Sequence, residues 1–526
     1  MNFNINKHSS LIIFVSYLLL LLVLSLFHFE RNTNYSVDDS FITYRYAFHL
    51  REGYGLVFNI GEAYYGTTAA GYAAVLTLFS SLGIFIANIL TINESYFSIQ
   101  NVSTFLSTMS LTTVSLLMFH ISGARKSILL SIPLFVFTSL LFYASPFNEV
   151  SGHETYAYLA TAFAGTVLVV FSNSYYLGAF FLAISASFRP DAVLFAAIVP
   201  VVDLFRSELS FKNYLKIKFL GFTAVYILVL GSWLLYLTIH FGSPVPGTMA
   251  AKKVQVALGY WPLYTMQVLR EYFSVALNSL GFNIVKVGLL GLILRYKFKE
   301  QTYIRSNLTY IAVVWILFGV LSASAYLIFN VTFWPWYGVP LFFSVLITTC
   351  IGWIKIFNLI EFSLVALGQN NKKIRLVELI SISIIVLALI LYTFPRMNKW
   401  ATTKNINLHT SSYSEIVDFI SKDSPQGAVI QISEPGSLAF HLGPKYKVVD
   451  ELGLISPGVA QALKRKDFSY TTNTWKAKYL VCSWRGHYSA CANSIILKDY
   501  NLAGEFNNEF WKPMLGSGAK LFKRKE

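Results

Sequence analysis

Two adjacent carboxylates, Asp38 and Asp39, stand near the start of the polar segment 36–71, which follows a long apolar run near the N-terminus. The segment reads SVDDSFITYRYAFHLREGYGLVFNIGEAYYGTTAAG. The helix dipole stabilises an acidic residue at a helix start, and one aspartate would suffice for that purpose. Neighbours on a helix point in different directions, so the second can face a cavity as a general base or a ligand for a divalent cation. The sequence leaves the plain helix start and the catalytic pair both open.

Four cations beside apolar runs are candidates for holding a phosphate group. Arg45 lies on the helix predicted after the acidic pair, and Arg189 opens an Arg-Pro-Asp turn. Lys252 and Lys253 follow the loop HFGSPVPGTMAA. The planar fork of arginine matches the geometry of phosphate. The alternatives are structural, because the arginines can pair with nearby acids and the lysines can bind anionic lipid head groups.

Two further motifs could line a sugar or acceptor site. Gly-His-Glu, with His153 and Glu154, begins one apolar run, and Trp-Pro-Trp-Tyr, with Trp334 and Tyr337, precedes another. The aromatic rings could stack on a sugar face. Alternatively, His and Glu at a helix start are interface residues, and Trp and Tyr form the aromatic belt common at membrane surfaces.

The elements that must position these residues are predicted to be membrane-spanning helices. The chain of 526 residues is 55% hydrophobic and 13% charged, with a mean hydropathy of +0.55, whereas soluble proteins carry about 25% charged residues. Residues 11–29 are long enough to cross the hydrocarbon core, and no small-residue cleavage site follows them. The sequence therefore predicts a polytopic α-helical membrane protein with an uncleaved N-terminal anchor.

Charge decides the predicted topology, because cytoplasmic loops carry an excess of Lys and Arg. The formal net charge is +15, and basic residues cluster near 125–126, 206–218, 295–305 and 355–375. After the first extracytoplasmic loop, 30–68, all four clusters stay cytoplasmic only if 69–90 returns to the face it left. We therefore interpret 69–90 as a re-entrant or juxtamembrane helical hairpin broken at its Gly and Ser residues. About eleven crossings follow, and the runs after the first are approximately 102–121, 127–144, 152–172, 177–188, 190–205, 218–240, 273–294, 306–329, 338–357 and 376–394.

The composition changes at about residue 396, which divides a transmembrane domain, 1–395, from a soluble extracytoplasmic α/β domain, 396–526. GAVIQIS, KYKVVD and KAKYLVCS are predicted strands, and EIVDFISKD and PGVAQALKRK are predicted helices. Cys482 and Cys491 could pair in an oxidising compartment, although their spacing alone does not decide it.

Several classes of function lack support. The sequence contains no phosphate-binding glycine loop, dinucleotide fingerprint, zinc-ligand spacing or nucleophile elbow, so cytosolic nucleotide chemistry is unsupported. The alternative class is a lipid or solute transporter or flippase of the cell envelope, which predicts inverted repeats and charges in the middle of spans. Here the ionisable residues gather at one predicted face, with Lys286 as the main exception.

The polar segment also resembles a known family. DDSFITYRYAFHLREGYGLVFNIGEAYYGTTAAGYA is similar to the first extracytoplasmic loop of integral-membrane GT-C glycosyltransferases that use polyprenyl-phosphate sugars, nearest to bacterial cell-envelope arabinofuranosyltransferases. The resemblance continues through SGHETYAY, SFRPDAVL and FGSPVPGTMAAK and more weakly through VVDELGLISP. Gly247 departs from the usual Asn, and Glu434 from the usual Asp of the appended domain. These departures bear on the identity of the acceptor more than on the type of reaction.

The resemblance implies transfer of a sugar, with arabinofuranose as a candidate, to a glycan, lipid or protein acceptor outside the cytoplasmic (inner) membrane that holds this multi-pass chain. In this scheme Asp38 is the first choice for the general base and Asp39 the second. The implied phosphate ligands are Arg45, Arg189, Lys252 and Lys253, and His153 and Glu154 would line the sugar or acceptor site. No cofactor is required, a divalent cation at the two aspartates stays optional, and no nucleic acid partner is expected.

Overall fold

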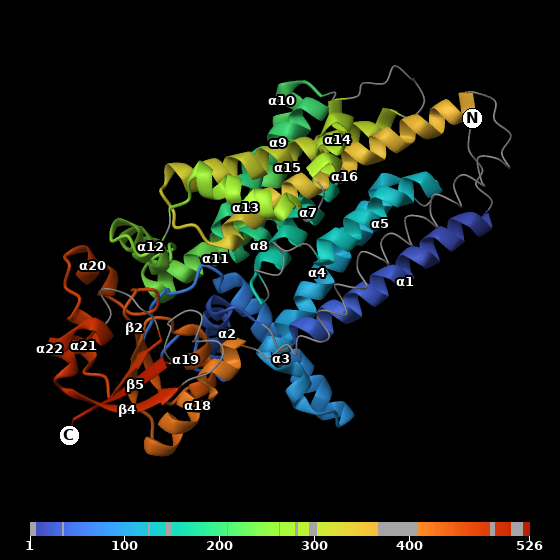
Figure 1. The fold of residues 1–526 in the computed structure, drawn as a ribbon. Coiled ribbons are helices and arrows are strands. Elements are labelled where there is room, and N and C mark those ends of the chain that lie inside the picture. The colour runs from blue at the N-terminus through green and yellow to red at the C-terminus, as the bar shows by residue number, and fades with distance from the viewer. Residues whose placement is uncertain are drawn as a thin grey trace.

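A bundle of helices carries a smaller α/β domain at one end (Figure 1). The computed structural model describes residues 7–33, 36–124, 127–143, 150, 152–207, 209–261, 263–278, 282–293, 302–366, 408–483, 490–506 and 519–525. The structure confirms the prediction of a mostly helical domain, with helices long and apolar enough to cross a membrane, and of a small C-terminal sheet. The predicted boundary at 395 and 396 lies outside the described residues.

The bundle contains a main set of helices and further helices at its ends. The main set is α1 (Lys7–Asn32), α4 (Ile99–Ser122), α5 (Ile128–Tyr143), α7 (Thr155–Val170), α8 (Tyr175–Phe188), α9 (Phe195–Arg206), α11 (Leu220–Phe241), α13 (Met266–Asn278), α14 (Phe282–Ile293), α15 (Thr302–Ile328) and α16 (Pro335–Ala366). The others are α2 (Asp38–Arg51), α3 (Ala70–Leu90), η1 (Glu94–Phe97), η3 (Pro190–Leu194), α10 (Phe211–Tyr214), η4 (Leu215–Phe219) and α12 (Gly247–Ala257).

Six helices within the described ranges are long and apolar enough to cross a membrane. They are Ser10–Asn32, Ala70–Leu90, Ile99–Ser122, Phe211–Phe241, Asn307–Ile328 and Pro335–Glu361. Shorter apolar helices, among them α7 and α8, lie beside them. The count of eleven crossings therefore stays a prediction, and the run 376–394 lies outside the described residues.

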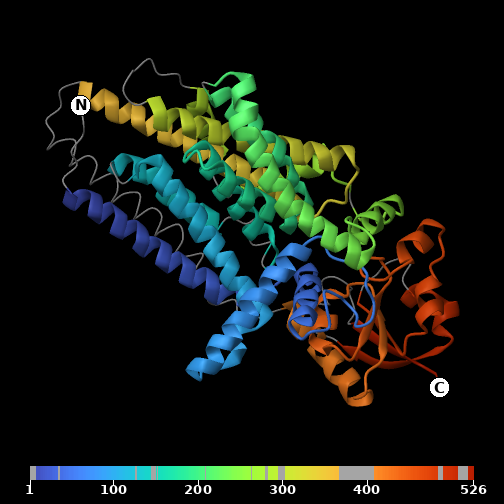
Figure 2. The ribbon, with the colours of Figure 1, turned by 180° about the vertical axis from the view of Figure 1, so that it is seen from behind.

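The hairpin predicted for 69–90 is not observed, because α3 is one unbroken helix of 21 residues. The Ser and Gly residues of α3 pack against neighbouring residues and do not interrupt the helix. Ser80 donates its hydroxyl hydrogen to the carbonyl of Phe97 at 2.6 Å, and a side chain at Gly83 would clash with the Phe97 ring. After α3 the chain turns through η1 and continues into α4. Both views show α3 leaving the bundle at a steep angle to α1 and α4 (Figures 1 and 2).

Small residues also set the packing inside the bundle. A Cβ atom at Gly352 on α16 would clash with the carbonyl oxygen of Gly288 on α14. Only glycine allows two helix backbones to approach so closely, a device common between membrane helices. Where helices lie further apart, a large side chain fills the space between them. The fully buried ring of Trp315 on α15 contacts Phe163 on α7 and Phe195 on α9.

The C-terminal domain is built on a five-stranded mixed sheet with the order β2-β1-β3-β5-β4. β1 pairs in parallel with β2 and β3, whereas β5 pairs antiparallel with β3 and β4. The disulfide that the spacing left open is present between Cys482 and Cys491. The elements are α18 (Leu408–Asp423), β1 (Val429–Ile432), α19 (Gly436–Leu442), β2 (Lys447–Asp450), α20 (Val459–Lys464), α21 (Tyr470–Trp475), β3 (Tyr479–Cys482), η5 (Ala490–Ala492), α22 (Ser494–Leu497), β4 (Tyr500–Phe506) and β5 (Ala519–Arg524).

Candidate active site

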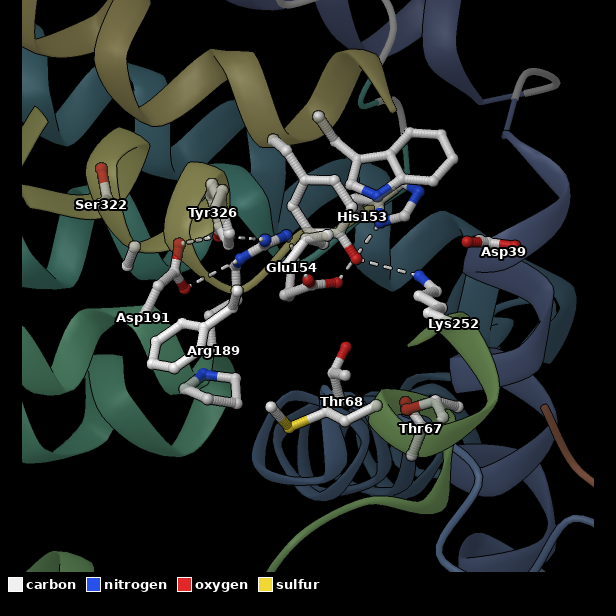
Figure 3. Close-up of a pocket in the computed structure, with 18 of the residues that line it drawn as sticks. Asp39, Thr67, Thr68, His153, Glu154, Arg189, Asp191, Lys252, Ser322 and Tyr326 are labelled. Carbon is white, nitrogen blue, oxygen red and sulfur yellow. Dashed lines mark hydrogen bonds and ion pairs between the residues drawn. The ribbon is translucent and has the colours of Figure 1, made fainter. Parts of the chain in front are cut away.

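A cavity of about 430 Å³ lies where the helical bundle meets the C-terminal domain. Its walls come from α2, the loop before α3, the start of α7, η3, α12, α15 and α16, and the C-terminal domain adds Leu454. Most of the lining is apolar, with charged groups at intervals (Figure 3). Seven of the ten predicted site residues line it: Asp39, His153, Glu154, Arg189, Lys252, Lys253 and Tyr337. The cavity is therefore the candidate active site.

The two aspartates that begin α2 have different surroundings. Asp39 lines the cavity. Asp38 does not, because its two carboxylate oxygens accept hydrogen bonds from the backbone N–H groups of Gly436 at 3.1 Å and Ser437 at 2.8 Å. A Cβ atom at Gly436 would clash with the Asp38 carbonyl, so this approach requires glycine. Asp38, the first choice from the sequence, thus caps α19, and of the two aspartates only Asp39 lines the cavity.

Arg45 does not lie in the cavity, contrary to the predicted phosphate contact. Its guanidinium, 1% exposed, donates to the carbonyls of Phe58 at 2.8 Å, Tyr446 at 2.7 Å and Gly443 at 3.3 Å, and also to that of Ala439. A cation near the last carbonyls of a helix is favourable because of the helix dipole. Arg45 therefore holds the C-terminal end of α19, as Asp38 holds its N-terminal end.

Arg189 lies in the cavity wall but is already paired with acids. It contacts Glu154 at 3.0 Å and Asp191 at 3.2 Å, and the Tyr326 hydroxyl donates to Asp191 at 2.8 Å. The carboxyl group of Glu154 also lies 3.5 Å from the ring nitrogen of His153. The guanidinium of Arg189 is therefore already engaged by two acidic side chains. The sequence analysis did not select Tyr326, because tyrosine in an apolar run has no distinguishing signal.

Among the described residues that line the cavity, Lys252 is a half-buried cation without a carboxylate ion pair. Its ammonium donates to the Tyr337 hydroxyl at 3.0 Å. Burial lowers the pKa of Lys252, but Tyr337 and Asp39 raise it more, so it lies above its usual value. Figure 3 shows Asp39 and Lys252 on one side of the cavity and Arg189 on the other. An anionic ligand would therefore find its positive charge at Lys252, with exposed Lys253 beside it.

Trp334, predicted to stack on a sugar, lies outside the cavity lining. Its ring stacks on Trp336 with centroids 5.0 Å apart and contacts Trp261 at 4.7 Å. Trp336 in turn stacks on His153 at 5.0 Å. The Trp-Pro-Trp-Tyr motif thus supports His153 through Trp336 and contributes Tyr337 to the cavity.

The optional divalent cation gains no support from the arrangement of the acids. Within the ranges that the structure describes, no group of three or more His, Cys, Asp and Glu side chains is arranged to hold a metal ion. Both carboxylate oxygens of Asp38 already accept hydrogen bonds from backbone N–H groups. The two aspartates therefore do not direct carboxylate oxygens toward one shared cation position.

Glu434 of the C-terminal domain adds a third carboxyl group near the aspartates. Burial, followed by the charges of Asp38 and Asp39, raises the pKa of Glu434 to about 8. The unfolded chain has a glutamate pKa near 4.3. The folded protein therefore binds one more proton between these values, and its stability must fall as pH rises through that window.

Substitution of Glu434 by glutamine is expected to flatten this pH dependence, because glutamine does not ionise. The midpoint of thermal unfolding, measured in detergent at pH 5, 7 and 9, should fall less steeply in Glu434→Gln than in the wild type. Exposed Glu415 on α18 provides the control, and Glu415→Gln should follow the wild type. Equal slopes in Glu434→Gln and the wild type would contradict the assignment.

No family model matches the sequence, and no curated protein matches it. The family resemblance therefore rests on the motifs of the sequence alone.

Proposed function

We propose that the protein is an integral-membrane glycosyltransferase of the GT-C type, which moves a sugar from a polyprenyl-phosphate donor to an extracytoplasmic glycan, lipid or protein. The resemblance to cell-envelope arabinofuranosyltransferases makes arabinofuranose the leading candidate sugar. One observation carries the proposal. Asp39 and Lys252 line the same largely apolar cavity, at the junction of a membrane-type helical bundle and a soluble domain.

The reaction assigns a separate task to each group. The acceptor hydroxyl attacks the anomeric carbon, the bond from that carbon to the phosphate oxygen breaks, and polyprenyl phosphate leaves with the bonding electrons. Asp39 takes the proton of the acceptor hydroxyl, which is typical work for a positioned carboxylate. Lys252, with Lys253, stabilises the negative charge of the leaving phosphate. The apolar lining suits the polyprenyl chain.

The charge distribution supports an extracytoplasmic site. Lys212, Lys216 and Lys218 lie on α10 and η4, at the end of the bundle remote from the C-terminal domain (Figure 1). Cytoplasmic ends of membrane helices carry the excess of Lys and Arg. We therefore assign that end to the cytoplasm and the cavity with the C-terminal domain to the outer face of the cytoplasmic membrane.

Substitution of Lys252 by methionine tests the proposed donor site. Loss of a charge-assisted hydrogen bond should weaken binding of polyprenyl phosphate by about 10- to 100-fold. Binding of the uncharged polyprenol should change little, because methionine preserves the apolar stem. Binding of both lipids to the purified protein can be measured by calorimetry.

Exposed Lys212, at the far end of the bundle, supplies the matched control. Lys212→Met should bind polyprenyl phosphate as the wild type does. If the wild type binds the phosphate and the alcohol equally well, the cavity is no phosphate site and the proposed function is wrong.

A further inference from the structure

The C-terminal domain contacts both of the helices that carry the proposed reaction groups. On α2, Asp38 accepts the N–H groups of Gly436 and Ser437 in α19, 398 and 399 residues further along the chain. Asp38 directly precedes Asp39, so the position of the proposed base depends on this contact. Arg45, also on α2, donates to the carbonyl of Ala439 on α19 and to that of Tyr446 in the segment after it. It therefore holds α19 against α2 as well.

A second contact reaches α12, the helix of Lys252. Gln255, 2% exposed, donates its side-chain N–H to the carbonyl of Leu452 at 2.8 Å. The indole N–H of Trp261 donates to the oxygen of the same side chain at 3.0 Å, which fixes its orientation. Gln255 lies three residues after Lys252 on the same helix. The C-terminal domain therefore also restrains the proposed phosphate-binding helix.

The domain also closes the wall between these helices. Leu454 lines the cavity, and its backbone approaches Gly66 so closely that a Cβ there would lie 2.8 Å from the Leu454 carbonyl oxygen. The carboxylate of buried Asp450 holds this turn by accepting the N–H groups of Leu454 at 2.6 Å and Ile455 at 3.1 Å. The side chain of Asp450 thus ties the two ends of the segment 450–455 together. This segment contacts Gly66 in the loop after α2 and, through Leu452, Gln255 on α12.

We propose that the C-terminal domain sets the position of the base relative to the phosphate-binding lysine, with Asp38 and Gln255 as the positioning residues. This inference rests on the proposed function and deepens it, because it makes the soluble domain part of the catalytic machinery. A displacement of about 1 Å at a reacting group can cost on the order of 10²-fold in rate. Each contact should therefore affect the step served by its own helix.

The two positioning residues predict different kinetic changes in the full-length protein. Asp38→Asn, which places an amide N–H against backbone N–H groups, should lower kcat at least about 10-fold with little change in the KM for the polyprenyl-phosphate sugar. Gln255→Leu should chiefly raise that KM and weaken binding of polyprenyl phosphate.

Gly436→Ala, made in the C-terminal domain, should reproduce the kcat effect of Asp38→Asn. The double variant Asp38→Asn with Gly436→Ala should be no slower than the slower single variant, because both break one contact.

A merely stabilising role would give another pattern. Asn493 caps α22 by accepting the N–H groups of Ile495 and Ile496, within the same domain and outside the cavity lining. Asn493→Ala removes a comparable cap and should lower the folded fraction without changing kcat per folded molecule, counted by gel filtration. If Asp38→Asn and Gly436→Ala also keep the wild-type kcat per folded molecule, the positioning role is wrong. If the wild type transfers no sugar, the proposed function is overturned and the positioning role with it.

Discussion

Substitution of Asp39 by asparagine is expected to lower the rate of sugar transfer by about 10²- to 10⁴-fold, the usual contribution of a general base. Asparagine has nearly the same shape but cannot take the proton of the acceptor hydroxyl. Because Asp39 lines the cavity and caps no helix of the C-terminal domain, the variant should keep the wild-type fold. Binding of polyprenyl phosphate should persist, since Lys252 remains.

The measurement compares initial rates of purified Asp39→Asn and wild type at matched protein concentration. Exposed Asp418 on α18 is the control, and Asp418→Asn should retain the wild-type rate. A wild-type rate in Asp39→Asn would exclude Asp39 as the base, whatever the behaviour of Asp38→Asn.

Substitution of Arg45 by leucine is expected to loosen the C-terminal domain from the bundle. Four backbone carbonyls, those of Phe58, Ala439, Gly443 and Tyr446, lose their donor at once. An unsatisfied buried polar group costs about 1–3 kcal/mol, so the loss should be on the order of 3 kcal/mol or more. Hydrogen exchange of the amides in 436–446 should rise strongly, and transfer activity should fall with it.

Arg51, on the same helix, provides a matched control for Arg45. It pairs with Glu52 at 2.9 Å near the surface, where an ion pair contributes about 0–1 kcal/mol. Arg51→Leu should therefore leave exchange in 436–446 near the wild-type level. Equal protection of this segment in Arg45→Leu and wild type would show that Arg45 does not dock the domain.

The residues of the site were predictable where local motifs carry them. Composition and apolar runs predicted the helical membrane domain, and the change of composition near 396 predicted the α/β domain. Gly-His-Glu and Arg-Pro-Asp stand at helix ends, and the chain brings their charged residues together through the ion pair of Glu154 with Arg189. Such motifs are readable because the residue type and its place beside a span both belong to the sequence.

The roles of Asp38 and Arg45 were not predictable, because their partners in the C-terminal domain lie 394 to 401 residues away. Both residues contact the short helix α19, whose position against α2 depends on the packing of the whole C-terminal domain. Helix periodicity separates Asp38 from Asp39 by direction but does not say which direction faces a cavity. The break predicted for 69–90 was wrong for another reason, because Ser80 and Gly83 pack against Phe97 of η1 and do not interrupt the helix.

The most direct test of the central claim follows a labelled sugar on polyprenyl phosphate. Purified protein in liposomes is incubated with this donor and with delipidated cell-envelope acceptor outside the vesicles. Sugar transfer predicts equal amounts of labelled acceptor and free polyprenyl phosphate with the wild type, and both products formed at least about 100-fold more slowly with Asp39→Asn. Movement of intact donor between the leaflets, with no polyprenyl phosphate released, would contradict the account and indicate a lipid transporter instead.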